Sequence, residues 1–354
     1  MSDHPMSIFA FEEAAKSRLP EAQWEWVVGA AEQGRTFRRN IEQFSEFGLR
    51  PAVLAGIATP NLKSNWQGYE VGSPVVAAPI GHLTQFHESG EIGVMEACRD
   101  TNTHCVVSMH TRRNLELLAQ AAGAARWSYQ VYLYSNPDVV ARQIDRALQL
   151  GAASIVVTVD SCHRSPSFGR QRLAWDARRV GQRDEMELPE SRDDRVWTWS
   201  MLQQLIRGLR IPIIVKGIQF APDALRAKDA GARGIWLSNH GGRVNETDQS
   251  LLREIATVRA HVGPEFPLVV DGGFRTGSDI AKALLLGASH VALGRPLIYG
   301  LVNNGGRGAV DVLNIANREL ALVLGSLGVS DVRHASEHGA QVFEITNARR
   351  HRRD

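Results

Sequence analysis

The sequence predicts an α/β fold, a (β/α)8 TIM barrel with an N-terminal helical extension and a long loop after the fourth strand. Eight short runs rich in valine and isoleucine recur along the chain, at 75–80, 104–110, 128–133, 154–160, 211–218, 234–240, 266–273 and 290–296. Each run is continuous rather than alternating in polarity, which is typical of strands buried on both faces. Helical patterns lie between the runs, for example at 137–150 and 278–286. Strands that alternate with helices in this way predict a barrel.

The chain has 354 residues, a length that α/β barrels can use as one unit. We therefore interpret 1–354 as a single domain, with a helical extension at 1–74, the barrel at 75–327 and a C-terminal tail at 328–354. The fourth and fifth strands start roughly twice as far apart as other neighbours, which leaves an extra arginine-rich segment at 161–195. A loop in this position lies on the catalytic face of a barrel. It is either a lid over the site or a mobile loop without a role in catalysis.

Composition excludes several classes of protein. Hydrophobic residues make up 44% of the chain and charged residues 22%, which is ordinary for a globular protein and excludes wholesale disorder. The formal net charge of +2 is spread along the chain, so no nucleic-acid partner is expected. Three irregularly spaced cysteines predict neither a disulfide framework nor a metal site. Because no signal-peptide pattern or membrane-spanning run is found, we expect a cytoplasmic protein without membrane insertion.

Polar residues gather where the predicted strands end, and in a barrel those ends converge on one mouth. His240 is followed by a Gly-Gly turn and by Arg243, a pattern that places a candidate base beside a guanidinium able to bind a carboxylate. Asp160, from another strand end, is placed to accept a hydrogen bond from the imidazole and orient it. A structural histidine and an aspartate that only caps a loop are the competing interpretations.

The last two strand ends carry glycines and arginines. The segment 271–277 reads DGGFRTG, and 294–296 reads GRP. Loops after strands seven and eight of a barrel often bind phosphate through backbone amides and a helix N-terminus. Glycine and arginine at both positions therefore predict a phosphate or a phosphorylated cofactor. Lys216, at the end of the fifth strand, fits either a positive charge beside a reduced flavin or a Schiff-base lysine.

Taken in order along the chain, these motifs resemble one enzyme family. They are Ala78-Pro79-Ile80-Gly81, Gln130-Val131-Tyr132, Thr158-Val159-Asp160, Val215-Lys216-Gly217, the segment 238–243, the segment 271–277 and Gly294-Arg295-Pro296. Together they resemble the FMN-dependent 2-hydroxy acid oxidase and dehydrogenase family, which includes glycolate oxidase, lactate oxidase and mandelate dehydrogenase. The resemblance extends over about 9–327, and the combination is far more specific than any single motif.

The resemblance implies FMN-dependent oxidation of a small 2-hydroxy acid to the 2-oxo acid. It implies that His240 is the base, that Asp160 pairs with it, and that Tyr132 assists catalysis and binds the substrate carboxylate together with Arg243. The implied FMN contacts are Ala78, Pro79, Ile80, Ser108, Gln130, Thr158, Lys216, Ser238, Asp271, Gly273, Arg275, Gly294 and Arg295. Oxygen, a quinone or a protein reoxidises the flavin in such enzymes. Members are commonly homotetramers, so a homo-oligomer is also implied.

Departures from the family pattern concern the substrate pocket. Trp26 aligns with a family tyrosine that binds the substrate carboxylate, and indole can donate a hydrogen bond but not accept one. An insertion precedes the second substrate arginine, for which Arg172 is favoured and Arg170 is the alternative. His110 stands where many members carry a bulky residue. These changes favour a larger or more polar hydroxy acid. A non-redox flavin enzyme of the isomerase type and a non-catalytic flavin-binding protein are the competing functions.

Overall fold

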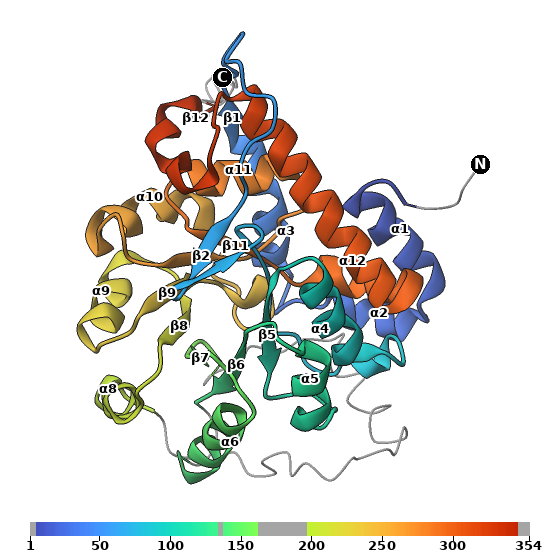
Figure 1. Cartoon of the computed structure of the whole chain (residues 1–354), viewed down its shortest axis with the longest axis vertical. Coiled ribbons are helices and arrows are strands. Elements are labelled where there is room, and N and C mark those ends of the chain that lie inside the picture. The colour runs from blue at the N-terminus through green and yellow to red at the C-terminus, as the bar shows by residue number, and fades with distance from the viewer. Residues whose placement is uncertain (1–4, 134–136, 162–196, 346–354) are drawn as a thin grey trace, which may run out of the picture.

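The computed structural model describes residues 5–133, 137–161 and 197–345. Eight parallel strands close into a barrel in the order β10-β11-β4-β5-β6-β7-β8-β9 (Figure 1). The strands are β4 (Val75–Ala77), β5 (His104–Ser108), β6 (Trp127–Tyr132), β7 (Ser154–Thr158), β8 (Ile213–Ile218), β9 (Gly234–Leu237), β10 (Leu268–Val270) and β11 (His290–Leu293). Each lies within or next to one of the eight predicted runs. The predicted TIM barrel is therefore confirmed.

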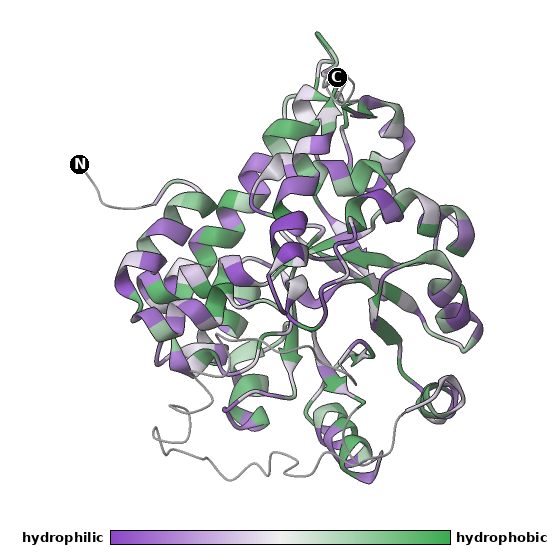
Figure 2. Cartoon of the chain, turned by 180° about the vertical axis from the view of Figure 1, so that it is seen from behind, coloured by the Kyte–Doolittle hydropathy of each residue, from purple (hydrophilic) through white to green (hydrophobic). Residues whose placement is uncertain are grey.

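Helices surround the barrel, and each packs an apolar face against the protein core. They are α4 (Gly90–Asp100), α5 (Leu115–Ala122), α6 (Pro137–Gln149), α8 (Trp199–Gly208), α9 (Ala221–Asp229), α10 (Leu251–Val262), α11 (Gly277–Leu285) and α12 (Arg295–Ser326). In α6, for example, Val140, Ile144 and Ala147 are buried, and this spacing forms one apolar stripe. Figure 2 shows the same contrast, with largely hydrophobic strands inside and mixed helices around them. Burial of a large aliphatic side chain contributes about 1.5–3 kcal/mol.

The segment before the barrel differs in part from the predicted helical extension. Its helices are α1 (Ile8–Arg18), α2 (Glu21–Val28), α3 (Arg35–Glu42) and the short η1 (Gln43–Glu46), but it also contains strands β1 (Phe47–Leu49), β2 (Ser64–Trp66) and β3 (Tyr69–Val71). The expectation of helices throughout 1–74 was therefore wrong for these three strands. β2 and β3 form a hairpin, and β1 pairs with a distant strand near the C-terminus. Short strands of this kind have no periodic signal of their own.

The segment after the barrel is also structured where it is described. The 3-10 helix η4 (Val332–Gln341) leads into β12 (Val342–Glu344), which pairs antiparallel with β1. The N-terminal and C-terminal parts of the chain thus meet in one small sheet (Figure 1). No helix among the described residues is long and apolar enough to span a membrane. The loop expected after the fourth strand, with Arg170 and Arg172, lies outside the described residues.

A polar cluster occupies the end of the barrel that the β2–β3 hairpin covers. The ring of Trp66 stacks on His104 at 4.2 Å and meets His290 edge-on at 5.1 Å. His104 binds the Tyr69 hydroxyl at 2.8 Å, and His290 binds the Ser64 hydroxyl at 2.9 Å. Burial lowers the pKa of His290 to about 4 and holds the pKa of His104 well below its usual value. Both rings are therefore neutral at pH 7.

Protonation of these histidines predicts acid sensitivity. Below about pH 6.5 the unfolded chain takes up protons that the folded chain resists until near pH 4. Stability is therefore expected to fall as pH drops through this window, by about 1.4 kcal/mol per pH unit for each histidine. Urea unfolding between pH 7 and pH 4.5 measures the slope. His290→Gln is expected to make the dependence of the unfolding free energy on pH shallower. His261→Gln, at an exposed position, is the control and should leave the slope unchanged. An unchanged slope in His290→Gln would contradict the prediction.

Candidate active site

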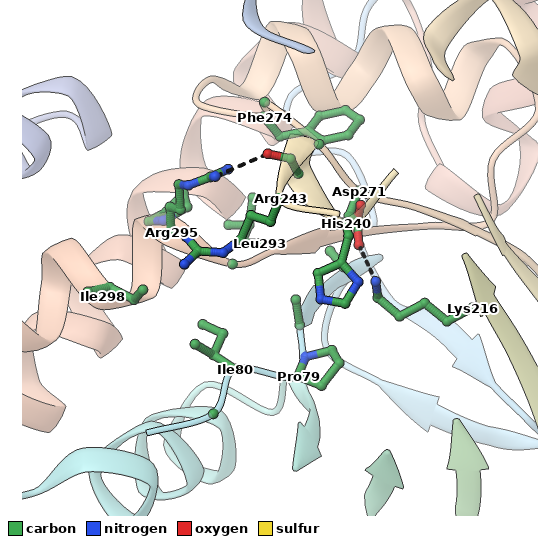
Figure 3. Close-up of a pocket in the computed structure, with 18 of the residues that line it drawn as sticks. Pro79, Ile80, Lys216, His240, Arg243, Asp271, Phe274, Leu293, Arg295 and Ile298 are labelled. Atoms are coloured by element: carbon green, nitrogen blue, oxygen red, sulfur yellow. Dashed lines mark hydrogen bonds and ion pairs between the residues drawn. The ribbon is translucent and has the colours of Figure 1, made fainter. Parts of the chain in front are cut away.

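A cavity of about 320 Å³ opens at the carboxyl ends of the barrel strands. Thirteen of the residues predicted from the sequence line it: Trp26, Ala78, Pro79, Ile80, Tyr132, Lys216, His240, Arg243, Asp271, Gly273, Arg275, Gly294 and Arg295. Figure 3 shows His240 and Lys216 approaching the cavity from one side, with Pro79 and Ile80 across from them. Residues from six barrel strand ends and from the N-terminal segment therefore converge on one site.

His240 is held in a strained and specific position. It follows β9 with a backbone φ of 57°, in the left-handed region that non-glycine residues rarely occupy. Its backbone amide donates to the Ser238 hydroxyl at 3.0 Å. On the ring, Nδ1 pairs with Asp160 Oδ1 at 3.0 Å and Nε2 lies 3.4 Å from the Tyr132 hydroxyl. Because Asp160 binds Nδ1, Nε2 is the ring nitrogen available for proton transfer in the cavity.

Asp160 is buried, with 6% of its side chain exposed. Burial by itself would raise its pKa, but the charge and hydrogen bond of His240, followed by the charge of Lys216, lower the pKa of Asp160 below its usual value. The carboxylate therefore stays ionised and stabilises a protonated imidazole. Gly217, with φ of 104°, makes room for it, because a Cβ at this position would lie 2.7 Å from Asp160 Cβ.

Lys216 belongs to a buried network at the ends of β8, β9 and β10. Its Nζ donates to Ser238 Oγ at 2.8 Å and lies 3.3 Å from Asp271 Oδ2. Ser238 Oγ donates to Asp271 Oδ1 at 2.7 Å, and the Trp236 indole donates to Asp271 Oδ2 at 3.0 Å. Burial would lower the pKa of Lys216, but Asp271 and then Asp160 raise it above its usual value. Lys216 is therefore a fixed positive charge, which argues against a Schiff-base role.

Two arginines mark the region predicted to bind phosphate. Arg295 donates to the carbonyls of Val27, Gly29 and Gly241, and burial lowers its pKa to about 10. Arg275 is buried and pairs with Glu12 at 2.9 Å. Because these three partners of Arg295 are carbonyls rather than carboxylates, its positive charge is suited to an incoming anion.

The glycine loop beside these arginines is packed against α3. A Cβ on Gly273 would lie 1.9 Å from the Asn40 carbonyl oxygen, so no larger residue fits there. At Gly294, by contrast, a Cβ would meet only Ala78, at 3.9 Å, and would project into open space. Since Gly294 lines the cavity, a side chain at this position would occupy room that a ligand needs.

Four predicted cofactor residues lie behind the cavity wall rather than on it: Ser238, which belongs to the Lys216 network, and three that form a chain of hydrogen bonds. Ser108 donates to the Gln130 amide oxygen at 3.0 Å, and the Gln130 amide nitrogen donates to Thr158 at 2.9 Å. All three side chains are buried, on β5, β6 and β7. This chain of hydrogen bonds fixes which way the amide of Gln130 points.

Arg243 and Trp26 form a stacked pair at the cavity. The guanidinium carbon of Arg243 lies 4.4 Å from the centre of a Trp26 ring, and its Nη1 donates to the Trp26 and Val27 carbonyls at 2.8 and 3.1 Å. A cation over an indole face is stabilised by the ring quadrupole. Trp26 thus contacts the arginine through the face of its ring.

Several residues that support the site carry no recognisable sequence signal. Asn40 on α3 and Asn239 exchange two buried side-chain hydrogen bonds of 2.9 and 2.8 Å. Glu12 on α1 accepts hydrogen bonds from Arg275 and from Tyr299. Trp236 reads as one more apolar strand residue in the sequence, although its indole holds Asp271. Each contact joins segments far apart in the chain, so spacing could not reveal it.

The asparagine pair predicts a measurable coupling. Asn40→Ala leaves the buried Asn239 amide without its partner, which is expected to cost about 1–3 kcal/mol of stability. Asn239→Ala has the same effect, and the double variant is expected to cost clearly less than the sum of the two. Urea unfolding of the wild type, the two single variants and the double variant measures this coupling. The exposed Lys63–Glu70 ion pair serves as the control: the same set of alanine variants at these two positions is expected to show little coupling. Strict additivity at Asn40 and Asn239 would contradict the prediction.

Comparisons with known proteins identify the family of this chain. The sequence model of the FMN-dependent dehydrogenase family matches residues 15–341. A peroxisomal (S)-2-hydroxy-acid oxidase of Oryza sativa subsp. japonica is 31% identical, over 93% of this chain and 93% of its own length. The 2-hydroxyacid oxidase 2 of Rattus norvegicus is also 31% identical, over 88% of this chain and 91% of its own.

Solved structures give the same result. A putative lactate oxidase of Pediococcus acidilactici superposes with a TM-score of 0.85 at 26% identity, covering 96% of this chain and 94% of its own. A mandelate oxidase with bound 3,3-difluoro-2-hydroxy-3-phenylpropionic acid superposes with a TM-score of 0.84 at 27% identity, covering 94% and 98%. Fold, cavity and full-length sequence similarity therefore agree: the chain belongs to the FMN-dependent 2-hydroxy acid oxidase and dehydrogenase family.

Proposed function

We propose that this protein oxidises a 2-hydroxy acid to the corresponding 2-oxo acid with FMN, and that His240 is the base. The observation that carries the proposal is the orientation of the imidazole. Nδ1 is bound by the ionised Asp160, and the ring lines the cavity beside Arg243. A base next to a carboxylate-binding guanidinium matches a substrate that bears a hydroxyl and a carboxylate on the same carbon.

The residues around the cavity fit FMN. Arg295, with the amides of the glycine loop, supplies positive charge and donors for the phosphate, and Arg275 lines the same region in its ion pair with Glu12. The ammonium of Lys216 and the space beside Gly294 suit a flat, electron-rich ring system. When bound, FMN supplies an acceptor for two electrons. We assign Ala78, Pro79 and Ile80 to the wall of the same cofactor site, because all three line the cavity.

The side chains of this protein divide the remaining work. Arg243 and Tyr132 bind the substrate carboxylate, and Tyr132 also keeps a hydroxyl 3.4 Å from His240 Nε2. Oxidation removes two electrons and two protons from the substrate. One of these protons goes to His240 Nε2, and Asp160 stabilises the imidazolium that results. The two electrons and the other proton would go to the bound flavin. A non-redox isomerase and a non-catalytic flavin-binding protein are not favoured, because the relatives are named as oxidases.

We further propose that oxygen reoxidises the flavin. The relatives reported above and the two solved structures are all named as oxidases. Admission of air to the substrate-reduced protein tests this. Rapid return of the flavin absorbance with formation of hydrogen peroxide supports oxygen, whereas return only after a quinone or a protein acceptor is added overturns it.

Anaerobic mixing with a panel of 2-hydroxy acids tests the proposed function. A substrate is expected to bleach the flavin absorbance in the wild type. In His240→Ala the same acid is expected to bleach it about 100- to 10,000-fold more slowly, because general-base catalysis is lost. FMN content, read from the oxidised spectrum, should stay unchanged. His334→Ala, at an exposed position far from the base, is the matched control. If the flavin of His240→Ala is bleached as fast as that of the wild type, His240 is not the base.

Gly217 provides a separate test of the Asp160–His240 pair. Gly217→Ala places a methyl group 2.7 Å from Asp160 Cβ and Cγ, which is too close, so the carboxylate is expected to shift relative to the imidazole. Flavin reduction is expected to slow by about tenfold or more with little change in substrate binding, because orientation of the base is lost. Stopped-flow measurement of the limiting rate and of the apparent dissociation constant separates the two effects. Gly231→Ala, at a similar φ outside the site, controls for backbone strain. Equal rates in the wild type and Gly217→Ala would contradict the prediction.

A further inference from the structure

Four rings line one wall of the cavity in a row. His82 stacks on His110 with 5.8 Å between ring centres, His110 stacks on Tyr132 at 4.7 Å, and Tyr132 stacks on His240 at 6.0 Å. All four residues line the same cavity. His240 and Tyr132 belong to the proposed chemistry, but His82 and His110 have no part in it. The row therefore extends the polar surface of the site away from the base.

The tautomer of His82 is fixed by a neighbouring arginine. Arg112 Nε donates to His82 Nδ1 at 3.0 Å. Burial, and after it the charge of Arg112, lower the pKa of His82 to about 4, so the ring is neutral at pH 7. A neutral imidazole that accepts at Nδ1 must carry its proton at Nε2. His82 thus brings one N–H donor to the wall, with a guanidinium directly behind it.

The loops that carry this wall are locked to each other. His82 has a backbone φ of 61°, and its amide donates to the His110 carbonyl at 3.1 Å. A Cβ on Gly81 would lie 2.6 Å from His110 Cβ, so the two turns are in close contact. A strained backbone that the surrounding structure holds in place is a frequent property of ligand-binding loops. The two imidazoles are therefore presented on a rigid surface.

The charge behind the wall is positive. Arg112 and Arg113 follow His110 in the chain after one threonine, Thr111. The nearby carboxylate, Glu91, is buried below the turn, where it accepts from the Leu83 amide at 2.9 Å. Burial raises the pKa of Glu91. A group that contacts the wall therefore meets the N–H donor of His82 and the positive charge of Arg112 behind it.

We propose that the preferred substrates are 2-hydroxy dicarboxylic acids, whose second carboxylate is bound by the His82–His110 wall. This inference rests on the proposed function, the oxidation of a 2-hydroxy acid, and specifies which class of 2-hydroxy acid is oxidised. An apolar substituent at the wall would remove water from the His82 N–H and leave that donor without an acceptor. Sites built to hydrogen-bond a substrate discriminate strongly against analogues that cannot do so. A second carboxylate accepts the hydrogen bond and matches the charge of Arg112.

A matched pair of substrates tests the proposal. 2-Hydroxysuccinate and 2-hydroxy-4-methylpentanoate have side chains of similar shape, one ending in a carboxylate and the other in two methyl groups. The kcat/KM for anaerobic flavin reduction is expected to be about 100-fold higher for 2-hydroxysuccinate, because the methyl groups cannot accept the hydrogen bond. Equal values, or a preference for the methyl compound, would overturn the assigned substrate class.

Substitutions in the His82–His110 wall test whether this wall causes the preference for the dicarboxylic acid. His82→Met keeps a side chain of similar length without an N–H donor, and it is expected to reduce the ratio of the two kcat/KM values at least tenfold. Arg112→Met is expected to act in the same direction, because it removes both the charge and the constraint on the tautomer. His334→Met, at an exposed position, is the control and should leave the ratio unchanged. A ratio that is unaffected in His82→Met would refute the role of this histidine.

Binding without turnover separates this inference from the proposed function. Succinate and 4-methylpentanoate are the same pair without the reactive hydroxyl, and their dissociation constants can be measured by calorimetry on the FMN-loaded protein. Tighter binding of succinate that His82→Met abolishes supports the wall even if no hydroxy acid reduces the flavin, an outcome that would sink the proposed function alone. If both hydroxy acids reduce the flavin but succinate binds no better, the dicarboxylate inference fails and the oxidation chemistry stands.

Discussion

The active-site region depends on balanced charges buried where the strands of the barrel end. Asp160 follows β7, Lys216 lies on β8, His240 follows β9 and Asp271 follows β10. An isolated buried charge is costly, whereas a paired and hydrogen-bonded one is tolerated. Lys216 lies 3.3 Å from Asp271, and Asp160 is held ionised by His240 and Lys216. Since parallel strands in register bring these ends together, closure of the barrel and formation of the charge network require each other.

The N-terminal segment completes this region from outside the barrel. Asn40 on α3 is bonded to Asn239, next to His240, and its backbone closes over Gly273 in the glycine loop. Glu12 on α1 holds Arg275, and the carbonyls of the Trp26 region hold both Arg243 and Arg295. Residues that surround a strained base and several arginines must themselves be fixed if the geometry is to persist. The extension is thus part of the site rather than a cover over one end.

The sequence was informative where a local pattern has one structural meaning. Continuous apolar runs located all eight barrel strands, and the strand ends identified His240, Asp160 and Lys216, because the barrel brings such ends together. The terminal strands β1 and β12 were missed, since each has three residues and is stabilised by the other across almost the whole chain. Trp236 and Glu12 were missed for the same reason, because their polar partners are distant in sequence. The contact between Arg112 and His82 Nδ1 likewise joins residues 30 positions apart, so no local pattern indicates it.

The two sides of the cavity are carried by different strands and loops. Residues that contact the substrate can therefore change on one side while the other side keeps its structure. The base side is built on β7 to β10, whereas the His82–His110 wall is carried by the loops after β4 and β5 and is locked by their mutual contacts. Tyr132, at the end of β6, stacks on both His110 and His240 and is the ring that links the two sides. Residues of the wall can therefore be replaced without disturbing the Asp160–His240 pair, provided that the face of Tyr132 stays covered. In this chain the covering ring is an imidazole, so the same contact that packs the phenol also makes the wall polar.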